Sequence, residues 1–315
     1  MNYLICGAGT IGTTYAYLLS RAHNVELLVK PEQAERLAGG VPMALKDLTK
    51  HAGTYERRTF RPRCVTEIEK PYDGVLVAVN RCQLQSLLPR LAQKRACAGY
   101  FAFMQNNWDL RSEVEACLGD APYAVAFPSN VGGGRDETGI QAILFDEPAR
   151  LGGPSRSAVE QLRQGFEAAG IRTCEDPAIF DWLKVHYLQQ SITAGALLER
   201  GSFAAFAKDY RAVKTMVAAF REGIAVCARQ GVDTRHVFPA NLFRLPTFLV
   251  AHTMQRMFLT QDTREMVENH SKKGLPEWAA GYREVLAAGR ALGLPMTAWA
   301  SYEGAVEAYL RGGPA

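Results

Sequence analysis

Paired cysteines are missing from this sequence. Its seven cysteines are scattered singly, with no Cys-x-x-Cys motif and no spacing to histidine that is typical of metal ligands. This pattern argues against a disulfide framework and against a zinc site, so we expect reduced, mostly buried thiols and no bound metal. The cysteines are Cys6, Cys64, Cys82, Cys97, Cys117, Cys174 and Cys227.

Long runs of charge and long apolar runs are also missing. The net charge of +4 is spread evenly, and basic residues are not interleaved with aromatic ones, so we expect no nucleic-acid partner. No apolar stretch reaches the length that crosses a membrane, so we expect no membrane partner. Because the first strand candidate leaves no room for a signal peptide, we expect the protein in the cytoplasm.

The length and composition favour two domains. A chain of 315 residues with 48% hydrophobic residues can bury a large core and is expected to divide in two.

A glycine motif lies between a strand pattern and a helix pattern at the start of the chain. The apolar run 3–6 leads into Gly7-x-Gly9-x-x-Gly12, and apolar residues at helical spacing follow over 13–19. This order is typical of a dinucleotide-binding unit, because the glycines permit a tight turn, close approach of a pyrophosphate, and close helix packing. The expected cofactor-binding residues are Gly7, Ala8, Gly9, Thr10, Ile11 and Gly12.

The second strand indicates which dinucleotide binds. Chains that prefer NAD usually carry an acidic residue at the end of this strand, to hold the ribose 2′-OH. Here the strand 25–29 is followed by Lys30 and Pro31, and Glu26 lies at its start. A cation therefore stands where a 2′-phosphate would lie, which predicts NADP as the cofactor. The alternative is an ordinary solvated lysine at a strand end.

Strand and helix patterns alternate over the first half of the chain. Apolar strands are predicted at 74–79, 100–104, 123–127, 140–145 and 171–174, and helices at 32–38, 83–91, 108–118 and 155–169. Continuous apolar strands separated by helices predict a parallel sheet covered on both faces. Residues 128–135 are glycine-rich but lack Gly-Lys-Ser/Thr, so we expect a loop that leads into the strand 140–145, and no P-loop.

The pattern changes near residue 175. Strand patterns end there, and helices are predicted at 178–198, 210–230, 248–259 and 276–292. We therefore expect an α/β protein: an NADP-binding, Rossmann-type doubly wound sheet in residues 1–175, followed by an all-α substrate and catalytic domain in residues 176–315.

Several short motifs together resemble the ketopantoate reductase family. They are Gly7-Ala-Gly-Thr-Ile-Gly12, Gln105-Asn106, Trp182-Leu-Lys184, and Thr253-Met254 followed by Glu265. Their order and spacing extend the resemblance over nearly the whole chain.

The resemblance implies catalytic roles for two residues. Lys184 corresponds to the general acid that protonates the substrate carbonyl oxygen while NADPH delivers hydride to the carbon. Glu265 corresponds to the acid that hydrogen-bonds the substrate and orients the lysine. Two alternatives stay open: Glu268, one turn further along, is the functional acid, or Lys184 is a surface lysine whose ammonium reaches solvent.

The resemblance also implies binding residues. Thr253 stands at a serine that binds the substrate carboxylate, and Asn106 at an asparagine that contacts both nicotinamide and substrate. Asn80 stands where the family has a lysine that contacts the cofactor, and Gln83 is retained.

This chain departs from the family on the helix that carries Lys184. Leu188 and Ile192 replace two asparagines that hold polar groups of ketopantoate, and Met257 replaces an acid. We expect Leu188 and Ile192 to line the substrate pocket, which would then favour a less polar 2-oxo acid.

Two functions of different classes follow. The first is NADPH-dependent reduction of a small-molecule 2-oxo acid to a 2-hydroxy acid, with Lys184 as general acid. The second is an NADP-binding sensor or regulatory protein of the same fold with little or no catalysis, which the lost asparagines would permit. A homodimer is one expectation for the assembly.

Overall fold

The computed structural model describes residues 1–50 and 53–312, apart from some side chains between residues 262 and 273. The chain divides into two compact units. Unit 1 comprises Met1–Gln105 and Asp109–Ile179, and unit 2 comprises Asn106–Trp108 and Phe180–Ala315.

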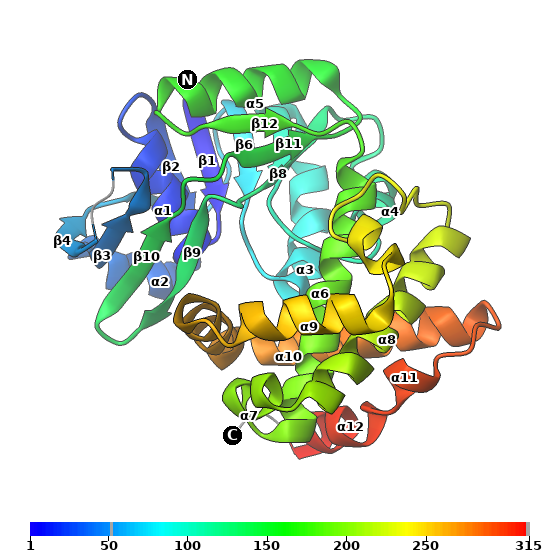
Figure 1. Cartoon of the computed structure of the whole chain (residues 1–315). Coiled ribbons are helices and arrows are strands. Elements are labelled where there is room, and N and C mark those ends of the chain that lie inside the picture. The colour runs from blue at the N-terminus through cyan, green and yellow to red at the C-terminus, as the bar shows by residue number, and fades with distance from the viewer. Residues whose placement is uncertain (51–52, 313–315) are drawn as a thin grey trace. The chain divides into compact units, whose positions relative to one another are not determined.

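The main sheet of unit 1 has eight strands in the order β12-β11-β8-β7-β6-β1-β2-β5 (Figure 1). In chain order these are β1 (Asn2–Cys6), β2 (Asn24–Leu28), β5 (Arg63–Val65), β6 (Tyr72–Val77), β7 (Ala98–Phe103), β8 (Tyr123–Phe127), β11 (Ala149–Gly152) and β12 (Thr173–Glu175). Neighbouring strands are parallel except β11 and β8, which are antiparallel. The predicted α/β fold with a parallel sheet and a helical second half is confirmed.

Helices of unit 1 follow the strands, as the alternating pattern predicts. They are α1 (Thr10–Leu19), α2 (Pro31–Ala38), α3 (Arg81–Gln93), α4 (Leu110–Leu118) and α5 (Arg156–Ala168), with the 3₁₀ helices η1 (Leu48–Lys50) and η2 (Arg95–Cys97). Helix α4 begins at Leu110, two residues after the predicted start.

The central strands of the main sheet are buried on both faces. Ile5 of β1 and Leu76 of β6 share one cluster with Tyr15 of α1 and Phe166 of α5, and the rings of Tyr15 and Phe166 lie 5.3 Å apart. Leu4 points to the opposite face and is 0% exposed. Alternate residues of a strand point to opposite faces, so burial on both faces explains why these strands are apolar throughout.

A second sheet of unit 1 corrects two predictions. It has the order β4-β3-β10-β9 and contains β3 (Val41–Asp47), β4 (Tyr55–Phe60), β9 (Val131–Asp136) and β10 (Gly139–Leu144). The strand predicted at 140–145 therefore lies outside the main sheet, and most of the predicted loop 128–135 is strand β9.

Glycine explains why strand β9 reads as a loop. Gly133 of β9 has a φ of +132°, and a Cβ there would lie 2.1 Å from the carbonyl oxygen of Gln141 on β10. Glycine is depleted in strands because it weakens them, yet it is required where another backbone comes this close.

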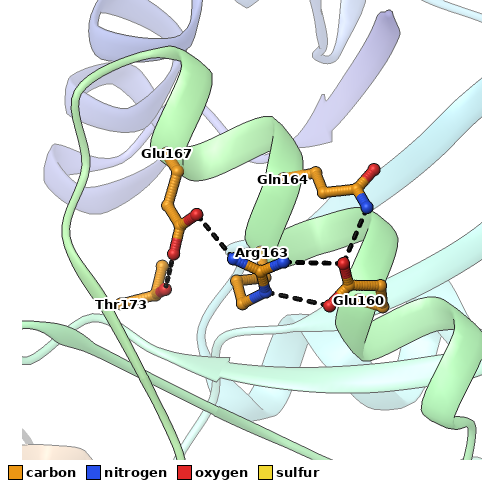
Figure 2. Close-up of polar contacts among 5 residues, drawn as sticks. All are labelled: Glu160, Arg163, Gln164, Glu167 and Thr173. Carbon is orange, nitrogen blue, oxygen red and sulfur yellow. Dashed lines mark hydrogen bonds and ion pairs between the residues drawn. The ribbon is translucent and has the colours of Figure 1, made fainter.

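Polar side chains on α5 form an exposed ion-pair group (Figure 2). Arg163 donates to Glu160 and Glu167, Gln164 also donates to Glu160, and Thr173 of β12 donates to Glu167. The hydrogen bond from Arg163 lowers the pKa of the Glu160 carboxyl to about 2. Exposed pairs of this kind contribute little to stability, so the group mainly connects α5 with the start of β12.

Unit 2 is helical over its described residues. It contains α6 (Ile179–Arg200), α7 (Phe203–Lys208), α8 (Tyr210–Arg229), η3 (Ala240–Arg244), α9 (Thr247–Phe258), α10 (Gln261–Ala291), α11 (Thr297–Ala300) and α12 (Glu303–Gly312). Its core includes Phe220, Tyr282 and Trp299, and the indole of Trp299 donates to the carbonyl oxygen of Tyr282.

Helix α10 starts earlier than predicted. It continues through Pro276, where the prediction placed its first turn. Proline is favoured in a first turn but is also tolerated within a kinked helix. The segment before Pro276 is polar and has no apolar stripe, so periodicity could not reveal it.

The seven cysteines are all free, but only Cys6 and Cys227 are buried. The expectation that most thiols are buried is therefore wrong, since Cys82 and Cys117 are exposed. Within the described ranges, no group of three or more His, Cys, Asp or Glu residues could hold a metal ion, and no helix is long and apolar enough to span a membrane.

The first prediction concerns thiol reactivity. Burial raises the pKa of the Cys6 and Cys227 thiols to about 12, and the thiolate is the reactive form. At pH 8, an alkylating reagent should therefore modify Cys82 and Cys117 well before Cys6 and Cys227. Peptide mapping by mass spectrometry measures the order, and labelling in guanidinium should make all four react. Equal rates in the native protein would contradict the burial assigned here.

The second prediction concerns packing of α5 on the main sheet. A Cβ at Gly165 would lie 1.8 Å from the hydroxyl oxygen of Tyr3, whose side chain is fully buried. Gly165→Ala should therefore destabilise the protein by about 1–3 kcal/mol, as overpacking does, and lower Tm by at least about 2 °C.

Gly304→Ala is the matched control for this packing test. A Cβ at Gly304 of α12 meets no atom within 4 Å, so this change should leave Tm unchanged or raise it slightly. Equal Tm values for the two variants would show that α5 does not press against Tyr3.

Candidate functional site

The loops after four neighbouring parallel strands lie at one edge of the main sheet. Strands β2, β1, β6 and β7 are adjacent in that order, so their carboxyl ends share this edge. From β1 the chain proceeds to β2 on one side, whereas β6 continues to β7 on the other. In open α/β sheets, ligands bind outside the carboxyl ends at this type of switch point.

The three glycines of the loop after β1 have the conformation and surroundings that the dinucleotide-binding motif requires. Gly7 has a φ of +107°, and a Cβ there would lie 3.0 Å from the carbonyl oxygen of Ala78, just after β6. A Cβ at Gly12 would lie 2.0 Å from the carbonyl oxygen of Gly7. A Cβ at Gly9 would meet no protein atom within 4 Å. Gly7 and Gly12 therefore permit close backbone packing, whereas Gly9 borders open space.

The start of helix α1 fits a phosphate group. Gly9 is the N-cap residue, and no side chain caps this end of the helix. The first backbone N–H groups of a helix have no partner within the helix, and the helix dipole makes this end positive. Open space at Gly9 and an uncapped helix start are the conditions under which a pyrophosphate binds.

The other predicted cofactor residues begin helices. Lys30 is exposed at the N-cap of α2, and Asn80 is the N-cap of α3. The Asn80 side chain accepts a hydrogen bond from the backbone of Gln83 at 3.0 Å, and the Gln83 side chain accepts one from the backbone of Asn80 at 3.3 Å. The sequence Asn-x-x-Gln resembles a capping box, a signal that the sequence analysis missed.

Gln105 connects the loops after β6 and β7. Its side-chain nitrogen donates to the carbonyl oxygens of Val77 and Val79, both at 3.0 Å. Because Gln105 is itself buried, these two bonds fix the backbone that leads directly to Asn106.

In unit 2, Lys184 of α6 is half-buried and contacts two further side chains. Its ammonium lies 4.7 Å from the ring centre of Trp108 and donates to Oε1 of Gln230 at 2.6 Å. Gln230 is the C-cap residue of α8. The aromatic face and the negative end of a helix dipole both attract a cation, so the Lys184 ammonium is held in one place.

Asn106 contacts the same helix as Lys184. Its Nδ2 lies 3.5 Å from Oε1 of Gln190 on α6, and its Oδ1 is buried with no hydrogen-bond partner among the described residues. The ring of Trp108 packs on Tyr187 of α6, with 5.7 Å between ring centres. The segment 106–108 is thus anchored on α6, and the Asn106 oxygen remains available as an acceptor.

The structure places Asn106 against α6, the helix that carries Lys184, and adds three side chains that the sequence did not predict. These are Trp108, Gln190 and Gln230. Trp108 lies two residues after Asn106, which is a usable signal. The two glutamines carry no local pattern, and only the packing of α6 and α8 reveals them.

Leu188 and Ile192, predicted to line the substrate pocket, instead lie in the core of unit 2. They are 0% and 1% exposed, and Leu188 packs against Gly223 of α8, where a Cβ would lie 2.9 Å from a Leu188 methyl carbon. Successive steps of four residues rotate by about 40° around a helix, so Ile192 is turned roughly 80° from Lys184. The two side chains therefore face neighbouring helices.

The remaining predicted residues lie on α9 and α10. Thr253 is exposed on α9, and Glu268 is exposed on α10. Glu265 is also part of α10, but its side chain lies outside the described part of the structure. The choice between Glu265 and Glu268 therefore stays a prediction.

A protein-family model supports the resemblance noted from the sequence. The model "Ketopantoate reductase PanE/ApbA" matches residues 3–146. No curated protein matches this chain.

Solved structures of similar fold extend over the whole chain. A D-mandelate dehydrogenase solved with NADH and anilino(oxo)acetate is 13% identical, covers 99% of both chains and has a TM-score of 0.74. A probable 2-dehydropantoate 2-reductase from Bacillus subtilis is 14% identical, covers 98% of this chain and 99% of its own, and has a TM-score of 0.73.

A third structure, 2-dehydropantoate 2-reductase from Methylococcus capsulatus, is 19% identical, covers 100% of this chain and 99% of its own, and has a TM-score of 0.69. These likenesses show the fold. The family model supports the resemblance to ketopantoate reductases over residues 3–146.

Proposed function

We propose that this chain, a divergent relative of the ketopantoate reductases, is an NADPH-dependent reductase that converts a small 2-oxo acid into a 2-hydroxy acid. The observation that carries the proposal is the position of the Lys184 ammonium, which is held by Trp108 and Gln230. The glycine loop supports it, because that loop fits a dinucleotide phosphate.

Different residues of this chain would bind the cofactor, donate the proton and position the proton donor. The glycine loop at the start of α1 would hold the phosphates of NADPH, which would supply a hydride for the carbonyl carbon of the substrate. Lys184 donates a proton to the carbonyl oxygen, so that the alcohol forms without a free alkoxide. Trp108 and Gln230 restrict the ammonium to one position, which lowers the entropic cost of alignment.

Three further side chains are assigned to binding. The Oδ1 of Asn106, which is buried with no hydrogen-bond partner among the described residues, is assigned to accept a hydrogen bond from the bound cofactor or substrate. The Thr253 hydroxyl, exposed on α9, donates to the substrate carboxylate. Glu265 orients Lys184 and the substrate.

We further propose that the substrate lacks the hydroxyl of ketopantoate. Leu188 and Ile192 stand at two positions of α6 where the family has asparagines, and both are apolar and packed in the core of unit 2. From these positions α6 therefore offers a substrate hydroxyl no amide. A buried hydroxyl without a partner costs roughly 1–3 kcal/mol, so 2-oxoisovalerate should be reduced about five- to 150-fold more efficiently than ketopantoate. The ratio of the two kcat/KM values is the measurement. A strong preference for ketopantoate would contradict this substrate class and leave the reductase assignment intact.

The third prediction tests Lys184 as general acid. Lys184→Ala should lower kcat by roughly two to four orders of magnitude, because removing a general acid costs that much. Oxidation of NADPH against a panel of 2-oxo acids measures the rate, and fluorescence titration should show NADPH affinity unchanged.

Lys214→Ala is the matched control for Lys184, since Lys214 is exposed on α8, and it should turn over like the parent. If Lys184→Ala retained the parent rate within about threefold, Lys184 would be a structural residue. If the parent protein binds NADPH but none of the 2-oxo acids in the panel causes NADPH to be oxidised, the result would instead support the sensor function.

The fourth prediction concerns Lys30. The cation at the end of β2 should make the parent bind NADPH more tightly than NADH, since an acidic residue there would favour NAD. Lys30→Asp should reduce this preference, as measured by fluorescence titration of each cofactor. Equal affinity of the parent for both cofactors would contradict NADPH selectivity.

A further inference from the structure

An arginine of the second sheet reaches the glycine loop. Arg135 is half-buried on β9, which packs against α1 (Figure 1). Its Nη1 donates to the carbonyl oxygen of Ala8 at 2.6 Å. Ala8 lies between β1 and α1, in the loop that fits a dinucleotide phosphate. The second sheet therefore places a cation at that loop.

A second arginine lies on α2, the helix that follows β2. Arg36 is exposed in the last turn of α2. Burial, and after it the charge of Arg36, lower the pKa of the Arg135 guanidinium. Among the described residues, neither arginine forms an ion pair with a carboxylate. A half-buried guanidinium without a counterion costs free energy, and a bound anion would offset that cost.

The chemistry of the pair selects the anion. A guanidinium has five N–H donors in a planar fork, and Ala8 takes a donor from one nitrogen of Arg135. The remaining donors match the paired oxygens of a phosphate. At this loop, the phosphates available are those of the dinucleotide.

We propose that Arg135 and Arg36 bind the 2′-phosphate of NADPH, and so set cofactor choice together with Lys30. Arg36 belongs to α2, which follows β2, and the end of this strand faces the adenosine ribose in dinucleotide-binding sheets. The pyrophosphate does not need these arginines, because the backbone N–H groups at the start of α1 bind it. The assignment rests on the proposed use of NADPH.

The test compares two cofactors that differ only in the 2′-phosphate. NADPH and NADH are titrated into the full chain by fluorescence, without a 2-oxo acid, for the parent, Arg135→Gln and Arg36→Gln. Loss of a charge-assisted hydrogen bond should weaken NADPH binding by roughly ten- to hundredfold in Arg135→Gln. NADH binding should stay within about twofold in both variants. Arg36→Gln should act in the same direction with a smaller effect, since Arg36 is exposed.

Arg57→Gln provides the matched control. Arg57 is exposed on β4 of the same sheet, so its loss should leave both affinities unchanged. Tm of each variant without cofactor measures folding, and the exposed Arg36 keeps the test decisive if Arg135→Gln is unstable.

Three results would overturn the assignment. If both variants bind NADPH as tightly as the parent, the arginines do not contact the cofactor, and the proposed function still stands. If NADPH and NADH are weakened equally, the arginines act on the pyrophosphate. If the parent binds neither cofactor, the proposed function fails and the assignment fails with it.

Discussion

The close contact between the backbones of Gly7 and Gly12 is the constraint on which the candidate cofactor site at the carboxyl ends of the strands depends. A Cβ at Gly12 would lie 2.0 Å from the Gly7 carbonyl oxygen, so a side chain of any size would force α1 away from the end of β1. Gly7 is also pressed against Ala78. One tight contact thus sets the start of α1, the end of β1 and the loop after β6 together. Gly9, which takes no part in this packing, borders the space that remains.

In unit 2, side-chain contacts hold the ammonium of Lys184 in position. The Lys184 ammonium lies over an indole ring and at the C-terminal end of α8. Both attractions are electrostatic, and both act on the charged form of the lysine. Leu188 and Ile192 on the same helix are buried in the core of unit 2 and anchor α6 there. The helix therefore combines an apolar face, which anchors it, with the face that carries Lys184.

The sequence predicted the elements whose patterns are local and strong. Strand β8 was predicted at its observed bounds, Tyr123–Phe127, because it is apolar throughout and buried. Strand β4 was missed, because its residues are mostly exposed and charged and no apolar alternation marks them. Strand β9 was missed because its glycines resemble a loop, although Gly133 is there to let β10 approach.

Site residues could be predicted from the sequence only where they belong to a local motif or to the family resemblance. The glycine loop follows from sequence order alone, and its geometry is the one the motif requires. Trp108, Gln190 and Gln230 come from three separate segments, and only tertiary packing assembles them around α6. The pocket-lining position expected of Leu188 and Ile192 did not hold, because a resemblance transfers positions along a helix but not the burial of the face on which they lie.

Strand β9 of the second sheet, which the sequence did not predict, bears on the candidate cofactor site. Strand β9 carries Arg135 to the carbonyl oxygen of Ala8, and it can do so only because Gly133 lets it pair closely with β10. A Cβ at Gly133 would lie 2.1 Å from the carbonyl oxygen of Gln141, so a side chain there would force β9 and β10 apart. The glycines that hid this strand from sequence analysis are therefore the residues that place a cation beside the glycine loop. Close backbone contacts at two glycines, Gly12 and Gly133, thus accompany the packing of helix α1 and strand β9 at the same loop.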